Sequence, residues 1–353
     1  MSKNRHFLTV LLLFILASAF GQDEYVVNQT KYTQKINASY FGMNELNRVG
    51  VLYNSLKVNN ATTMDNKYLF GSLAFPDLNF TIGVDLNSFK MPNTNLTLNL
   101  AKLAYIYTIQ LGNETFLLPG LYVGFGSSNL NVDNLIFEDQ LDTATGFINT
   151  ESIDPLADII ANTSYFDMGA SFILHSEDYL IGLSLKHLNR PNTSFNQEVP
   201  YEKPIQVSVQ GGYEFNINPY EFRYLPRYSY LYAYGSVTKF GDSYFMSFSQ
   251  DFQLGEFSLG FVEQASFVSY LDNMETSTQG ETTNTGAGLN NIGLTVGLAL
   301  ENFDFGVHYN FPFRNTGKVF SPSMFELSVI FDFSIYRRNN RGLYKRLQID
   351  NYY

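Results

Sequence analysis

Residues 292–311 constrain the fold of this chain most narrowly, because two runs of alternating apolar and polar residues flank a short turn. The apolar row consists of Ile292, Leu294, Val296, Leu298 and Leu300 before the turn, and of Phe303, Phe305, Val307, Tyr309 and Phe311 after it. Side chains on a strand point alternately to opposite faces, so the pattern predicts a β-hairpin with one apolar and one polar face. The polar row carries Gly, Asp and His where a soluble sheet usually carries Lys and Glu. The hairpin is therefore typical of strands that have lipid outside and a polar lumen inside.

The same alternation recurs along the chain and predicts about 14 strands of an all-β, antiparallel transmembrane barrel. They lie near 48–57, 67–76, 79–90, 96–111, 115–127, 163–175, 179–188, 204–217, 228–239, 243–252, 255–268, 289–300, 303–313 and 323–333. Many of these runs have about ten residues, the length that a tilted strand needs to cross a bilayer. Between 96 and 111 the apolar positions change from even to odd numbers, which predicts a β-bulge near Ala101.

Short and long connections alternate between the predicted strands. The short ones are 77–78, 112–114, 176–178, 253–254 and 301–302; most of the long ones are 58–66, 128–162, 189–203, 269–288 and 314–322. Outer-membrane barrels have short periplasmic turns and longer outer loops, so we expect a protein integral to the outer membrane with both termini in the periplasm. Connection 218–227 is long for a turn and 240–242 is short for an outer loop, so these two fit the scheme less well.

A soluble β-sandwich is the alternative fold, since its strands alternate too. Its outward rows would carry charged residues, whereas the polar rows here carry mainly Gly, Ser, Asn and Gln. Only 16% of the 353 residues are charged, and the chain contains 32 Phe and 25 Tyr. Aromatic residues favour β structure and membrane interfaces, so the composition favours the barrel.

The first residues have the composition of a signal peptide, because a basic start that ends at His6 precedes the apolar run 7–16. No later run of about 18 apolar residues could form a transmembrane helix. The predicted organisation is a signal peptide at 1–21, an N-terminal periplasmic segment at 22–47, the barrel at 48–333 and a basic C-terminal periplasmic tail at 334–353. A formal net charge of −11 argues against nucleic acid as a partner.

Two segments are candidate sites for partner docking. The connection 127–162 is the longest, and long loops without a strand pattern are often functional. Its candidate docking residues, acidic and aromatic, are Phe137, Glu138, Asp139, Asp142, Phe147, Asp154 and Asp158. A plug that only closes the pore is the alternative role for this loop. The tail offers five basic residues for an acidic periplasmic partner, with a disordered tail as the alternative: Arg337, Arg338, Arg341, Lys345 and Arg346.

The sequence predicts no catalytic, metal or cofactor site. The chain has no Cys and only four His, without the spacing that zinc sites use. It also has no phosphate-binding loop, EF-hand or nucleophile elbow. His308 lies with Asp304 on a predicted lumen row, where a hydrogen-bonded structural role is expected.

Several segments resemble the PorP/SprF family, outer-membrane barrels associated with the type IX secretion system of the Bacteroidota. They are Ile36–Gly42, Leu103–Tyr107 with its continuation at Leu121–Gly126 and Leu135–Leu141, Phe166–Ser171 with Tyr179–Leu188, and Phe325–Phe333. The resemblance implies a non-enzymatic barrel of the type IX secretion and gliding system. Such a barrel helps to secrete large surface adhesins, or anchors them, by binding their C-terminal signal domain. The implied partners are outer-membrane lipid, that domain and periplasmic components of the secretion machinery.

A passive porin or a channel for hydrophobic substrates is the alternative function on the same fold. A barrel of 14 strands is wide enough for an open lumen unless loops or side chains fill it. Phe116, Leu118 and Tyr122 are predicted to face the lumen, which indicates a filled interior and weighs against the porin.

Overall fold

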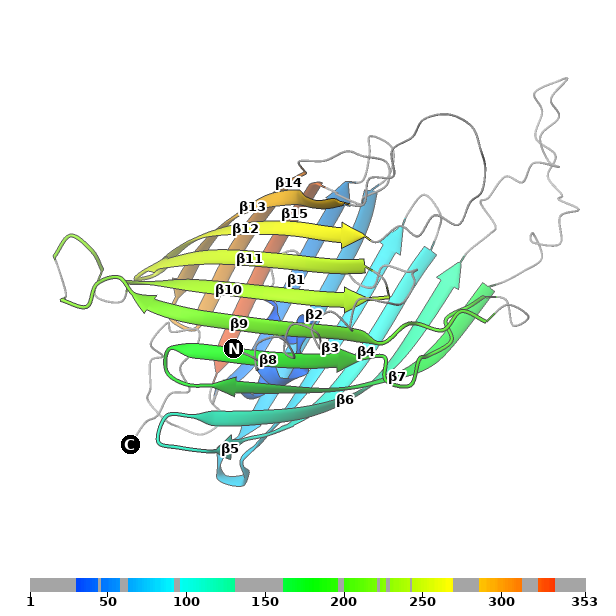
Figure 1. Ribbon diagram of the computed structural model, residues 1–353, viewed down its shortest axis with the longest axis horizontal. Coiled ribbons are helices and arrows are strands. Elements are labelled where there is room, and N and C mark those ends of the chain that lie inside the picture. Colours follow the sequence, from blue (N-terminus) through cyan, green and yellow to red (C-terminus); the bar gives the residue numbers. More distant parts are fainter. Residues whose placement is uncertain are drawn as a thin grey trace, which may run out of the picture.

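The computed structural model describes residues 30–43, 46–57, 63–91, 96–130, 161–195, 200–220, 223–226, 229–241, 243–268, 286–312 and 323–333. In these residues a single antiparallel sheet closes into a barrel (Figure 1). Its strands are β1 (Asn47–Lys57), β2 (Thr63–Phe75), β3 (Phe80–Met91), β4 (Leu96–Tyr107), β5 (Ile109–Gln110), β6 (Phe116–Leu130), β7 (Ala161–His175), β8 (Tyr179–Lys186), β9 (Gln206–Asn216), β10 (Ser229–Phe240), β11 (Ser243–Leu254), β12 (Phe257–Val268), β13 (Gly286–Leu300), β14 (Phe303–Pro312) and β15 (Ser323–Phe333). Within the described residues, no helix is long and apolar enough to cross a membrane.

The wall has 14 strands, as the sequence predicts. There are 15 strand segments, but β5 continues β4 beyond Thr108, and both pair with β6 in one register. The ring closes where β1 pairs with β15, from Asn47 opposite Phe333 to Lys57 opposite Ser323. Each remaining strand pairs with its neighbour in the chain, so the barrel is a simple up-and-down ring.

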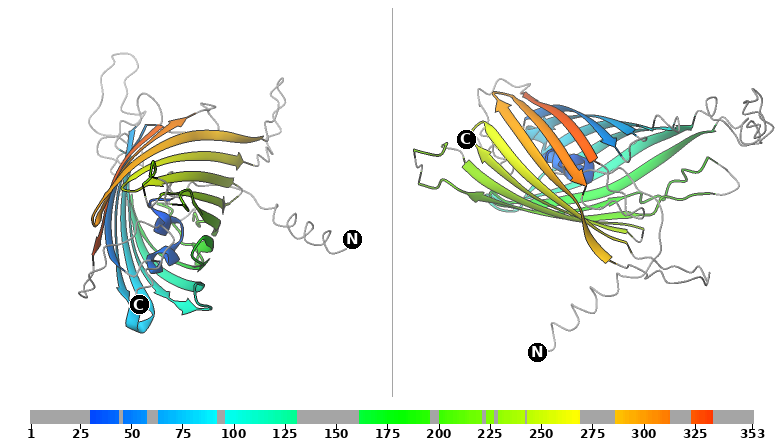
Figure 2. Two further views of the ribbon diagram at one scale, coloured as in Figure 1. Left: turned by 90° about the vertical axis from the view of Figure 1, so that its left-hand side faces the viewer. Right: turned by 90° about the horizontal axis from the view of Figure 1, so that it is seen from above.

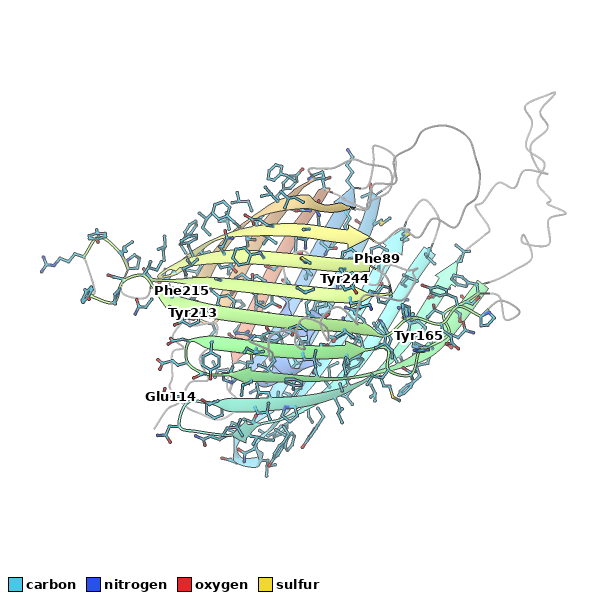
Figure 3. The ribbon with its side chains drawn as sticks, viewed as in Figure 1. Phe89, Glu114, Tyr165, Tyr213, Phe215 and Tyr244 are labelled. Carbon is cyan, nitrogen blue, oxygen red and sulfur yellow. The ribbon has the colours of Figure 1, made fainter. Side chains whose placement is uncertain are left out.

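The apolar rows face outward and the polar rows face inward, as predicted from the hairpin 292–311. In β13 and β14 the side chains of Leu298 and Phe305 are exposed, whereas Thr295 and His308 are buried in the lumen. Aromatic residues stand on the outer face toward both ends of the strands, for example Tyr213 with Phe215 in β9 and Tyr244 in β11 (Figure 3). An apolar outer belt with aromatic residues near its two edges is the surface that a transmembrane barrel presents to lipid.

The prediction of a β-bulge near Ala101 is wrong. Strand β4 pairs with β3 from Leu96 to Tyr107 without a register shift, and Leu100 points into the lumen, where it is buried. The reason is that the lumen holds apolar as well as polar side chains here, so Leu100 can point inward and no bulge is needed to turn it outward. A register shift occurs instead between β12 and β13, at Gln264 and Ala265.

One end of the barrel, called the turn side here, carries short connections. They lie at 76–79, 111–115, 176–178, 255–256 and 301–302. Asn79, Gly255 and Glu301 adopt positive φ angles of 54°, 63° and 52°, which let the chain reverse within few residues. The wall begins at Asn47 and ends at Phe333 on this same side. The opposite end, the loop side, carries the longer connections, most of which lie outside the described residues together with 1–29 and 334–353.

The structure differs from the separate periplasmic segment expected at 22–47. Residues Thr30–Met43, called the plug here, lie inside the ring of strands (Figure 2). The plug contains a short α-helix, α2 (Thr33–Ile36), and a 3₁₀-helix, η2 (Ala38–Gly42). Its large apolar side chains are buried against the wall, namely Tyr32, Ile36, Tyr40, Phe41 and Met43. Exposing so much apolar surface to water would be unfavourable, which is why the segment belongs inside the barrel.

Candidate functional site

Asn37, which is fully buried at 0% exposure, makes several of the polar contacts that hold the plug in the lumen. Its side-chain oxygen accepts a hydrogen bond from the backbone N–H of Ser39 at 2.9 Å and so caps η2. Its amide nitrogen donates to the carbonyls of Phe172 and Leu183, both at 3.3 Å, and to Gln210 Oε1 at 2.9 Å. One side chain therefore joins the plug to three neighbouring strands, β7, β8 and β9.

Ser39 adds a second polar contact with β7. Its backbone N–H donates to Ser171 Oγ at 3.2 Å, and the two hydroxyl oxygens lie 2.8 Å apart. Both side chains are buried, so these hydrogen bonds form away from water, where leaving either group unpaired would be costly. The Asn37–Ser39 segment is therefore attached to the wall by specific hydrogen bonds and not by apolar packing alone.

Lysine side chains fix the two ends of α2. Lys31 forms an ion pair with Asp304 at the turn-side end of β14. Lys186 Nζ donates to the carbonyl of Lys35 at 2.8 Å. The ammonium of Lys35 lies 5.0 Å from the centre of the Tyr68 ring, within range of a cation–π interaction. All three lysines are buried, and each contacts a partner in the wall or the plug.

Glycines in the wall make room for the plug. A Cβ at Gly83 in β3 would lie 2.3 Å from the ring of Phe41, and a Cβ at Gly120 in β6 would lie 2.8 Å from Ser39 Oγ. These distances are shorter than any ordinary van der Waals contact, so the close approach of the plug to the wall requires glycine at both positions.

The substitution Gly83→Ala tests this close approach. We expect it to lower the free energy of unfolding by about 1–3 kcal/mol, because the added methyl group must displace Phe41. Urea unfolding in phospholipid vesicles measures the change. Gly71→Ala in β2 is the matched control, since its Cβ would find its nearest atoms at 3.7 Å. Equal losses in the two variants would contradict a tight fit at Gly83.

The plug occupies the middle of the lumen and reaches toward the turn side. Gly83, Ile106 and Leu118, which contact it, lie close to the turn-side ends of β3, β4 and β6. Phe116, Leu118 and Tyr122 are buried, which confirms the prediction of a filled interior. A second buried apolar cluster, Leu56, Val262 and Met324, includes residues near the loop-side ends of β1 and β15. The described part of the barrel is therefore packed and is not a wide water channel.

Polar side chains of the lumen form hydrogen-bonded pairs. Asp167 lies 2.9 Å from His187 Nδ1 and accepts a hydrogen bond from the Tyr122 hydroxyl at 3.2 Å. Thr295 Oγ1 and His308 Nδ1 are 2.7 Å apart. Among the described residues, no group of three or more His, Asp or Glu side chains is placed to hold a metal ion. These pairs join neighbouring strands of the wall inside the lumen.

None of the predicted docking residues can be located. Those in the acidic loop and those in the basic tail lie outside the described residues: Phe137, Glu138, Asp139, Asp142, Phe147, Asp154, Asp158, Arg337, Arg338, Arg341, Lys345 and Arg346. The plug was not predicted as a site from the sequence. Its signal was the motif Ile36–Gly42, noted for its family resemblance, together with the buried aromatic residues around it.

A closed ring of 14 antiparallel strands with an apolar belt and an occupied lumen defines the class of outer-membrane β-barrel proteins. Comparison with protein families then gives the particular family. The model described as "Type IX secretion system membrane protein PorP/SprF" matches residues 21–331. The chain therefore belongs to the PorP/SprF family, and the resemblance noted in the sequence is confirmed. This is a family of secretion-related membrane proteins and not a known enzyme class.

Solved structures with similar folds share little sequence with this chain. A TodX deltaS2S3 mutant monoaromatic hydrocarbon channel has a TM-score of 0.48 and 9% identity, over 90% of this chain and 96% of the other. The P. putida toluene transporter TodX has a TM-score of 0.46 and 9% identity, over 85% and 93% of the two chains. BamA from Haemophilus ducreyi has a TM-score of 0.41 and 10% identity, over 81% and 70%. No curated protein matches the sequence significantly.

Proposed function

We propose that this barrel anchors a large secreted adhesin, or helps to secrete it, by binding the C-terminal signal domain of the adhesin at the loop side. In this proposal the loop side faces the cell surface, and the turn side, with both chain termini, faces the periplasm. Family membership supports a role in type IX secretion. The observation that carries the choice of the loop side is the plug, because it is packed in the lumen with contacts near the turn-side ends of β3, β4 and β6.

The plug also weighs against a passive porin or a channel for hydrophobic substrates. A porin needs a continuous water-filled path through the barrel. Here Tyr32, Ile106 and Leu118 are each at 0% exposure and form part of one packed cluster across the lumen. A non-enzymatic binding role requires no such path, so it fits the filled interior better.

The acidic loop is the proposed contact with the adhesin domain, and the basic tail is the proposed contact with periplasmic secretion components. Both segments extend from ends of the wall that suit these roles. The loop joins the loop-side ends of β6 and β7, and the tail follows Phe333 at the turn side. Opposite charges on the two segments would favour different partners on the two sides of the membrane.

Neutralising the acidic loop tests the proposed contact. We expect Asp139, Asp142, Asp154 and Asp158, all changed to Asn, to reduce recovery of the adhesin at least about tenfold, because rim charges control how fast partners associate. Recovery is measured by pulling the barrel from native outer membranes and quantifying, by mass spectrometry, a large protein that ends in a secretion-signal domain.

A matched control removes charge on the opposite side of the barrel. Glu177→Gln with Asp178→Asn changes two exposed acidic residues in the turn between β7 and β8. This variant should retain the adhesin at the level of the unaltered protein. Undiminished recovery after complete deletion of 132–160 would remove the loop from the proposal.

A further inference from the structure

The outer wall carries a groove that the role in adhesin binding does not explain. The groove has a volume of about 410 Å³, within the range of about 300–1,000 Å³ typical of ligand sites. Its apolar part is formed by outward-facing residues of β1, β2, β3, β4 and β6, namely Val51, Leu69, Leu86, Ala101 and Phe125. The hollow exists because the small Ala101 lies directly between the larger Leu86 and Phe125 in the strand register.

A row of polar residues borders the groove toward the loop side. Lys67 pairs in register with Ser88, Ser88 with Asn99, and Asn99 with Ser127. The Ser88 hydroxyl donates to Asn99 Oδ1 at 2.8 Å. The groove therefore spans the boundary at which the apolar belt of the barrel gives way to polar side chains, the level of lipid headgroups.

Lys67 lines the groove at this boundary, and two more lysines lie beyond it toward the loop side. Lys57, Lys67 and Lys90 lie on the neighbouring strands β1, β2 and β3, and all three are exposed. Within the described residues none of them forms an ion pair. The nearby acidic residue, Asp65, accepts a hydrogen bond from the Tyr53 hydroxyl at 3.0 Å. Asp65 lies opposite Lys90 in the strand register, so one carboxylate accompanies three ammonium groups and the wall on the loop side of the groove keeps a net positive charge.

We propose that this groove binds a membrane lipid that carries a phosphate headgroup. An acyl chain fits over Ala101 between Leu86 and Phe125, and the phosphate lies beside Lys67 and Lys90. An apolar floor that ends at unpaired cations matches an anionic amphiphile in both shape and charge. The site is independent of adhesin binding and needs only that the barrel span a membrane.

The test measures lipid retention by the purified full-length barrel. The protein is exposed in detergent micelles to equal amounts of phosphatidylglycerol and phosphatidylcholine, and the bound lipid is counted by native mass spectrometry. We expect the unaltered protein to prefer the anionic lipid. Lys67→Gln with Lys90→Gln should reduce that preference roughly tenfold or more, since each lysine near a lipid phosphate contributes a factor of about five.

Two further variants distinguish lipid binding in the groove from a general electrostatic attraction of anionic lipid to the barrel. Ala101→Phe fills the hollow and should reduce retention of both lipids, while heat-dependent gel mobility reports whether the barrel has folded. Lys239→Gln is the matched control, since Lys239 also faces outward near the loop side but lies on β10, far from the groove, over the ring of Tyr244 at 5.5 Å. It should retain lipid like the unaltered protein. Equal retention in all variants, or a dimer that Ala101→Phe dissociates without loss of lipid, would overturn the proposal.

Discussion

Deletion of residues 30–43 should convert the closed barrel into a conducting one, with single-channel conductance in planar bilayers rising at least about tenfold. The wall closes through pairing of β1 with β15 and does not depend on the plug for its ladder. An up-and-down barrel of this size encloses a wide interior, which the plug now occupies. Once it is removed, inward polar residues such as Ser171, Ser208 and Gln210 would line a hydrated path.

The control for this deletion removes the same length of chain from the other end. Deletion of 340–353 takes 14 residues, as does deletion of 30–43, and should leave the conductance at the level of the unaltered protein. Both variants need the heat-dependent gel mobility of a folded barrel. A folded barrel that lacks 30–43 and still fails to conduct would show that the loop side closes the lumen alone.

The wall could be predicted from the sequence because its constraint is local. Each strand needs only an alternation between neighbouring positions, and lipid outside makes that alternation strong, as in 292–311. The lumen row with His308 and the inward Phe116, Leu118 and Tyr122 follow from the same alternation. The prediction of a bulge near Ala101 was wrong because it required every inward row to be polar, whereas the lumen accepts Leu100.

The plug could not be predicted because its constraints are not local. Helix α2 has four residues and η2 has five, too few for a helical period to show. The contacts that hold them join distant parts of the chain, such as Asn37 with Phe172, 135 residues apart. The role of the buried Asn37 follows from its hydrogen bonds to β7, β8 and β9, and the sequence alone does not show that these strands surround it.

Asn37→Ala should loosen the plug while leaving the wall closed. The substitution removes the cap of η2 and three donated hydrogen bonds, and it leaves Gln210 Oε1 and two carbonyls without this donor. Losing a cap costs about 1 kcal/mol and leaving buried groups unpaired costs about 1–3 kcal/mol. Together, about 2–4 kcal/mol would raise the population of released plug by about 30- to 700-fold, since 1.4 kcal/mol is a factor of ten.

The absence of Cys from the chain makes this release measurable. A single cysteine at Ala38, which packs against the buried cluster of the lumen, should react slowly with a water-soluble thiol reagent, and much faster when Asn37→Ala is added. Asn189→Ala is the matched control, because Asn189 also donates to a β7 carbonyl, that of Phe166 at 2.6 Å, but is exposed on the loop side. If both variants accelerate labelling equally, the effect comes from general loosening of β7. A selective effect of Asn37 would show that this one side chain holds the plug in the lumen.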